Sequence, residues 1–172
     1  MADTTTVVSS FDAWYRAEHP RLLGLLTVAA GDADLGRDLT AEAFTRALER
    51  WDRVGDMASP AAWTYRVGVN LLRRRLRRAA VESRLWSTAT AAPPSPAALE
   101  PDLWAAVRAL PVRQRTAVAL RYVCDLPQAE VAAVMGVSPG TVSATLTSAR
   151  RSLAARLENH ETASTPLEVG HD

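Results

Sequence analysis

The chain has 172 residues, enough for two small helical domains of roughly 60 to 80 residues each. Hydrophobic residues make up 48% and charged residues 23%, a composition that excludes wholesale disorder. The single cysteine excludes a disulfide framework and any zinc site built on cysteines. Segments rich in Ala, Leu and Val, with an aromatic content of only 6%, favour helices over sheet. We therefore expect an all-α protein without a structural metal or a cofactor.

Targeting signals are absent from the sequence. The longest apolar run, residues 22–30, has about half of the roughly 20 residues that cross a bilayer. The first residues, M-A-D-T-T-T, carry no positive charge of the kind that begins a secretory signal. These features predict a cytoplasmic protein that has no membrane partner.

The net charge of +1 conceals blocks of opposite sign. Residues 1–62 carry six arginines and ten acidic residues, whereas residues 63–92 carry seven arginines and one glutamate. The chain has no lysine, so every fixed positive charge is a guanidinium, which suits bidentate contact with phosphates and base edges. The basic block is therefore the first candidate for a nucleic-acid surface.

A proline-rich stretch divides the chain into two halves. Four of the ten prolines lie between residues 93 and 101, where they favour a semi-rigid linker over a helix. We place this linker at residues 79–101, between helical domains at residues 9–78 and 102–157. Residues 1–8 and the acidic tail at 158–172 lack an apolar face, and we expect both to fray.

Three helices are predicted in the first half, and they should form a small bundle. The first covers residues 11–30 after two serines, Ser9 and Ser10, that serve as caps. The second covers residues 32–50, and its apolar side chains recur at helical spacing. The third covers residues 59–78 and begins with Ser-Pro, a capping serine followed by proline at the first helical position.

The third helix separates an apolar stripe from a cationic one. At 100° per residue, the apolar stripe comprises Tyr65, Val69, Leu72 and Leu76. The neighbouring stripe comprises Arg66, Asn70, Arg73 and Arg77, flanked by Arg74, Arg78 and Trp63. Arginines interleaved with an aromatic ring suit a nucleic-acid strand, because they combine phosphate contact with base stacking. The alternative is a solvated helix end whose arginines complement the helix dipole.

Four helices are predicted in the second half, at residues 102–109, 111–123, 128–135 and 139–157. The junction V-M-G-V-S-P-G-T has helix-turn-helix spacing, because Gly136 can adopt a left-handed conformation while Ser138 and Pro139 cap and start the next helix.

Enzymatic chemistry finds no support in the sequence. The three histidines, His19, His160 and His171, are far apart, so neither a catalytic triad nor a metal site is indicated. The glycines form none of the recognised phosphate-binding loops.

The order of these segments resembles a known family. D-L-T-A-E-A-F-T-R-A at residues 38–47 precedes W-T-Y-R-V-G-V-N-L-L-R-R-R at 63–75, and after the linker come L-P-V-R-Q-R-T-A-V-A-L-R-Y and E-V-A-A-V-M-G-V-S-P-G-T-V. The chain is similar in these segments to bacterial extracytoplasmic-function sigma factors. The resemblance implies a three-helix region 2 that binds core RNA polymerase and melts the minus-ten promoter element. It also implies a four-helix region 4 that reads the minus-thirty-five element.

The resemblance also assigns residues to these roles. Contact with the polymerase clamp helices falls on Asp38, Leu39, Glu42, Phe44 and Arg46. Minus-ten contact falls on Trp63, Arg66, Asn70, Arg73, Arg74 and Arg77, in agreement with the cationic stripe. The loop between residues 51 and 59 is the expected wall of a pocket for an unstacked base. Further partners implied are the polymerase flap and an anti-sigma protein.

The minus-thirty-five surface departs from the family pattern. The resemblance assigns it to Ser138, Gly140, Thr141, Ala144, Thr147, Ser148, Arg150 and Arg151. Family members commonly carry basic residues where this chain reads V-S-A-T-L-T-S-A-R, so we expect weak promoter recognition without polymerase. In the polymerase-binding helix, Ala41 stands where the family usually has glutamine.

Two other functions remain open at this stage. One is a helix-turn-helix regulator that acts without polymerase, although no heptad seam supplies a dimer interface. The other is a sigma-like protein that occupies polymerase and no longer reads promoters, as the neutral recognition helix suggests.

Overall fold

The computed structural model describes residues 4–83 and 101–164 of the chain, with side chains at 10–81 and 103–158. Within these ranges all regular structure is helical, and the expected all-α class is confirmed. The helices are α1 (Thr4–Ala30), α2 (Ala33–Leu48), α3 (Trp51–Val54), α4 (Pro60–Ser83), α5 (Pro101–Arg108), α6 (Val112–Tyr122), α7 (Gln128–Met135) and α8 (Pro139–Ser164).

Several helices are longer than their sequence patterns predict. α1 begins at Thr4, so Ser9 and Ser10 lie inside the helix and do not cap it. α4 continues to Ser83, and α8 extends to Ser164 through residues that we expected to fray. Once a helix has formed, each added residue gains a hydrogen bond at little cost, so polar sequence alone does not end it. Most of the predicted linker, residues 84–100, lies outside the described residues.

The predicted helix starts depend on side-chain caps that the structure confirms. Ser59 Oγ accepts a hydrogen bond from the Ala62 amide at 3.1 Å, and Ser138 Oγ accepts one from the Thr141 amide at 3.1 Å. Asp32 caps α2 in the same way through the Leu35 amide at 3.0 Å. Gly136 has φ of 67° and ends α7 in the left-handed conformation that the helix-turn-helix junction requires.

The helices α1, α2 and α4 pack as a bundle around the predicted apolar stripe. Tyr65, Val69 and Leu72 of α4 are buried against Leu22 and Leu26 of α1 in one hydrophobic cluster. α3, a single turn that the sequence pattern did not reveal, closes one end of this bundle. Its Trp51 ring packs against α1 side chains, and Trp51 Nε1 donates a hydrogen bond to Ser10 Oγ at 2.9 Å.

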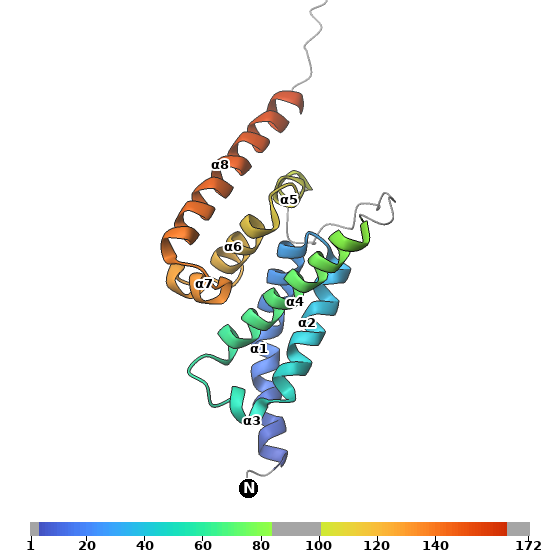
Figure 1. Ribbon diagram of the computed structural model, residues 1–172, viewed down its shortest axis with the longest axis vertical. Coiled ribbons are helices and arrows are strands. Elements are labelled where there is room, and N and C mark those ends of the chain that lie inside the picture. Colours follow the sequence, from blue (N-terminus) through green and yellow to red (C-terminus); the bar gives the residue numbers. More distant parts are fainter. Residues whose placement is uncertain (1–3, 84–100, 165–172) are drawn as a thin grey trace, which may run out of the picture.

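The second helical group is a helix-turn-helix unit that packs on the first. Val131 of α7 and Val142, Leu146 and Ala149 of α8 are buried between these helices and α6. Figure 1 shows this group beside the α1–α4 bundle, with α6 against α1 and α7 against α4. Most buried apolar residues of both groups belong to one hydrophobic cluster.

The contact between α1 and α2 depends on Gly36. A Cβ atom at this position would lie 2.5 Å from Thr27 Oγ1 and 2.7 Å from Thr27 Cα. Because the Thr27 backbone is fixed inside α1, we expect Gly36→Ala to lower the free energy of unfolding by about 1–3 kcal/mol or more. Urea denaturation followed by circular dichroism measures this loss.

Gly140→Ala is the matched control for that measurement. A Cβ atom at Gly140 would meet its nearest neighbour, Ser138 Oγ, at 3.8 Å. Since alanine also favours helix over glycine, we expect a stability equal to or slightly above that of the parent. Equal stability of the two variants would contradict the close approach of α1 and α2 at Gly36.

Candidate polymerase and nucleic-acid interface

The six residues predicted to contact the minus-ten element lie together on α4. Arg66, Asn70, Arg74 and Arg77 are exposed, whereas Trp63 and Arg73 are half-buried. The neighbouring apolar stripe of the helix is held in the bundle core, which fixes the direction of this cationic face. The predicted separation of an apolar and a cationic stripe is thus confirmed.

The five residues predicted to contact polymerase divide into two sets. Asp38 and Glu42 are exposed and Arg46 is half-buried, with an Arg46–Glu42 ion pair of 2.5 Å along the outer face of α2. Leu39 and Phe44 are only 5% and 3% exposed and pack in the bundle core. These two side chains are therefore absent from the surface of α2. They pack beneath the helix and hold its outer face, with Asp38, Glu42 and Arg46, in place.

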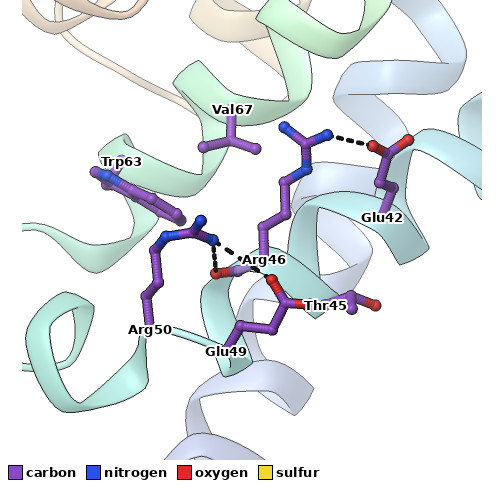
Figure 2. Close-up of a pocket in the computed structure, with 7 residues that line it drawn as sticks. All are labelled: Glu42, Thr45, Arg46, Glu49, Arg50, Trp63 and Val67. Atoms are coloured by element: carbon purple, nitrogen blue, oxygen red, sulfur yellow. Dashed lines mark hydrogen bonds and ion pairs between the residues drawn. The ribbon is translucent and has the colours of Figure 1, made fainter.

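A groove of about 570 Å³ lies between α2 and the first two turns of α4. Figure 2 shows Glu42, Thr45, Arg46, Glu49 and Arg50 on one side of this groove and Trp63 and Val67 on the other. The surfaces predicted for polymerase and for DNA thus meet along one edge of the bundle. Sequence analysis missed Arg50, although its position four residues after Arg46 is a signal that could have found it.

The expected pocket wall after Trp51 begins with the single turn of α3. Gly55, Asp56 and Met57 follow this turn and are exposed. Trp51 is held by edge-to-face and tilted ring contacts with Phe11 and Trp14, with centroid separations of 5.1 and 4.6 Å. The exposed loop is therefore anchored at its start on a rigid aromatic cluster.

The predicted minus-thirty-five surface lies on the outer side of α8. Seven of its eight residues are exposed and one, Thr141, is half-buried. Two members have partners in α6: Gln114 Nε2 donates to Ser148 Oγ at 3.1 Å, and Arg150 Nε donates to Tyr122 OH at 3.0 Å. Among the residues of this surface, all of which are described, Arg151 is the guanidinium without a hydrogen-bond partner. The predicted minus-thirty-five surface therefore presents little unpaired positive charge to DNA.

Comparisons with known proteins identify both helical groups. The family model described as Sigma-70 region 2 matches residues 14–81, and the model described as Sigma-70, region 4 matches residues 101–153. The chain belongs to the sigma-70 family. Members of this family are transcription initiation factors and are not enzymes.

Solved structures share this fold. The sigma factor RpoE from Bartonella quintana, in complex with the anti-sigma factor NepR, gives a TM-score of 0.75 at 20% identity, over 86% of this chain and 96% of its own. CnrH, in complex with the cytosolic domain of CnrY, gives a TM-score of 0.61 at 22% identity, over 92% and 99%. None of the curated proteins compared with the chain matches it.

Region 2 of this sigma factor contacts region 4 through arginines of the α4 face. Arg66 Nη2 donates to the Ala133 carbonyl at 2.7 Å, and Arg73 Nη2 donates to the Met135 carbonyl at 2.9 Å. Both carbonyls belong to the last turn of α7, where backbone acceptors lack partners within the helix and carry partial negative charge. Sequence analysis did not reveal this contact, since nothing local relates residue 66 to residue 133.

Region 4 in turn contacts region 2 through Arg115 of α6. Its side chain, 9% exposed, donates to the carbonyls of Ala29 at 3.0 Å and Ala30 at 3.2 Å, the last residues of α1. It also donates to the carbonyls of Arg108 at 2.7 Å and Leu110 at 2.8 Å within region 4. Burial, and then the neighbouring Arg108, lowers the pKa of this guanidinium.

Three titratable groups lie at the same interface beside α1. The Tyr65 hydroxyl donates to Glu18 Oε2 at 2.5 Å, and the Cys124 thiol of region 4 lies 3.7 Å from the Arg21 carbonyl. Burial raises the pKa of Cys124 to about 12, although a hydrogen bond with Tyr65 acts in the opposite direction. Burial, followed by the hydrogen bond to Glu18, also raises the pKa of Tyr65.

The membrane and metal predictions concern residues that are largely described. Within residues 4–83 and 101–164, no helix is both long and apolar enough to cross a membrane. The same residues contain no group of three or more His, Cys, Asp or Glu side chains placed to hold a metal ion.

The raised pKa values of Cys124 and Tyr65 predict a loss of stability at alkaline pH. The unfolded thiol ionises near its ordinary pKa of 9.0 and the folded thiol only near 12, so between these values the unfolded state binds fewer protons. The stability contributed by the protonated thiol is complete below pH 9 and falls by up to about 1.4 kcal/mol per pH unit above it. Urea denaturation at pH 8, 9, 10 and 11 measures this slope.

Cys124→Ala supplies the comparison for the alkaline series. The variant loses some packing at every pH, but the thiol part of the slope disappears and only the Tyr65 part is left. Parallel curves for the parent and the variant would show that Cys124 is not buried in the folded protein.

Proposed function

We propose that this chain is an extracytoplasmic-function sigma factor that binds core polymerase through the α2 face and melts promoter DNA through the α4 face. The carrying observation is that Trp63, at the start of the α4 face, lines one groove together with Glu42 and Arg46 of the charged α2 face. A single edge of region 2 can thus contact polymerase and, beside it, the strand that polymerase separates. We further propose that the protein acts in the cytoplasm, where its polymerase and promoters are.

The α2 contact is assigned to Asp38, Glu42 and Arg46, with Leu39 and Phe44 fixing their position from the core. The exposed fractions of the first two side chains support this division. The Glu42–Arg46 pair is solvent-accessible and contributes little to folding, so both groups are available to a partner of mixed charge.

Melting is assigned to the α4 face and the loop after α3. An unstacked base costs a few kcal/mol, which base stacking and phosphate contacts can offset. Trp63 offers an indole to stack on, and Arg66, Asn70, Arg74 and Arg77 offer exposed polar groups to the backbone. The exposed residues Gly55 to Met57 lie on the loop that we propose as the pocket wall.

Minus-thirty-five reading is assigned to α8, with Arg151 as its main phosphate contact. The paired state of Ser148 and Arg150 supports weak recognition, which polymerase contact through the flap would have to strengthen. We also propose a protein partner of the anti-sigma kind, because the similar RpoE was solved with an anti-sigma factor.

Charge reversal on α4 tests the DNA surface. We expect Arg77→Glu to reduce open-complex formation about tenfold and to lower the salt dependence of promoter binding by about one counterion. Arg75→Glu makes the same charge change on the opposite side of α4, and both arginines are exposed. Permanganate footprinting of the melted strand measures the effect. Equal losses in the two variants would contradict a specific DNA face.

Run-off transcription with core polymerase and genomic templates tests the function as a whole. A sigma factor yields specific transcript starts that core polymerase alone does not yield. Sequence-specific operator binding without polymerase would instead establish the independent regulator. Both results can be read with the unmodified protein.

The neutral face of α8 favours one alternative function, that of a polymerase-bound protein that reads no promoter. In that case Thr147→Arg, on the exposed side of α8, should create promoter affinity where the parent has none. In a working sigma factor the same change only alters the affinity of the holoenzyme for promoters that it already recognises. Electrophoretic mobility shift of the holoenzyme distinguishes the two outcomes.

A further inference from the structure

We propose that a cavity between α4, α6 and α7 is a binding site for a free nucleoside polyphosphate. Arginines from both regions hold the phosphates, and apolar side chains pack against the nucleoside. The cavity is separate from the groove between α2 and α4, and it shares no lining residue with that groove.

The cavity has the size of a small-molecule site. Its volume of about 480 Å³ lies within the range of about 300–1,000 Å³ that is usual for such sites. It lies where α7 contacts both α4 and α6, and its lining includes Arg73 of α4 and Arg113 of α6. Because α4 belongs to region 2 and α6 to region 4, two guanidinium groups that are 40 positions apart in the sequence line one cavity.

The arginines at this cavity have no acidic partner. In the part of the chain that the structure describes, none of the ion pairs involves Arg73, Arg113 or the neighbouring Arg77. Arg73 donates through Nη2 to the Met135 carbonyl at 2.9 Å, which leaves its other N–H donors for a ligand. Burial, followed by the charges of Arg113 and Arg77, lowers the pKa of Arg73. A polyphosphate brings several negative charges in one small group and offsets this accumulation of positive charge.

The rest of the lining suits a nucleoside. Val112, Met135 and Val137 provide apolar surface on which a planar base can pack. Gly136 lies beside them, and a Cβ atom there would meet no heavy atom within 4 Å, so the space next to it is open. Among the described lining residues, only Thr116 and the two arginines have polar side chains. With so few polar groups to read a base, we expect the site to bind adenine and guanine nucleotides alike.

Calorimetric titration of the full-length protein tests the site with ATP as the probe, at fixed ionic strength and with EDTA present. We expect ATP to bind with a dissociation constant below about 1 mM, and GTP to bind with similar affinity. AMP and pyrophosphate should each bind at least about tenfold more weakly, because AMP lacks two phosphates and pyrophosphate lacks the nucleoside. Adenosine should show no binding at about 1 mM.

Three variants that each neutralise one exposed arginine show where the phosphates bind. Arg113→Gln lies outside the surfaces proposed for polymerase and DNA, and it should weaken ATP binding about 10- to 100-fold. Arg74→Gln changes the DNA face of α4 and Arg156→Gln changes the end of α8, and neither residue lines the cavity. Both variants should keep the parent's affinity within about twofold, because salt screens exposed charges outside the site.

Each contrary result overturns the site or one part of it. Absence of ATP binding at about 1 mM overturns the site, whatever the variants do. Equal losses in Arg113→Gln and Arg156→Gln would show general charge attraction only. A loss in Arg74→Gln without one in Arg113→Gln would place the phosphates on the DNA face. Equal affinities for pyrophosphate and ATP would overturn the contact with the nucleoside.

The titrations are independent of the proposed function. They use neither polymerase nor promoter DNA, so ATP binding can fail while run-off transcription succeeds, and the reverse. Urea denaturation of Arg113→Gln should give the parent's free energy of unfolding, since its side chain is exposed and has no ion pair among the described residues. The ligand series on the unmodified protein still decides the proposal if that variant is unstable.

Discussion

A buried guanidinium must find hydrogen-bond acceptors, and the relation between the two halves of this protein follows from where Arg115 finds them. Transfer of an unpaired charge from water into a protein interior is too costly to persist. Arg115 meets this demand with four backbone carbonyls, two of them at the end of α1. Gly31, with φ of 72°, turns the chain there, and a Cβ on it would lie 3.4 Å from the Arg115 Cζ atom. The end of α1 in region 2 is thus shaped around a side chain of region 4.

The interface combines this anchored arginine with a reciprocal contact from the other side. Arg66 and Arg73 of region 2 cap α7, just as Arg115 of region 4 caps α1. In both directions the acceptor is a helix C-terminus, whose partial negative charge favours a cation. Such contacts with backbone carbonyls do not depend on the side chains of the receiving helix. They are also reversible, since water can replace either partner when the regions part.

Local periodicity accounts for what the sequence predicted well. The apolar stripe of α4, the caps at Ser59 and Ser138 and the left-handed Gly136 each depend on residues within one or two turns. Helix ends were predicted less well, because the continuation of α4 and α8 through polar residues carries no local stop signal.

Burial and contacts that join residues far apart in the sequence could not be predicted from local periodicity. A family resemblance placed Leu39 and Phe44 in a contact surface, but burial in a bundle depends on the neighbours that the fold supplies. The α4 arginines were predicted as a cationic face on periodicity alone. Their bonds to Ala133 and Met135 follow from the docking of region 4, which joins residues more than 60 positions apart.

The electrostatics of Arg73 show that opposing forces act on the contact between the two regions. Burial, followed by the nearby charges of Arg113 and Arg77, lowers the pKa of Arg73. The packing of region 4 on α4 therefore concentrates positive charge around a partly desolvated guanidinium, although that group keeps its bond to the Met135 carbonyl at 2.9 Å. Separation of the regions would hydrate Arg73 and remove Arg113 from its surroundings. The hydrogen bonds to the α7 carbonyls thus favour the contact, whereas the like charges oppose it.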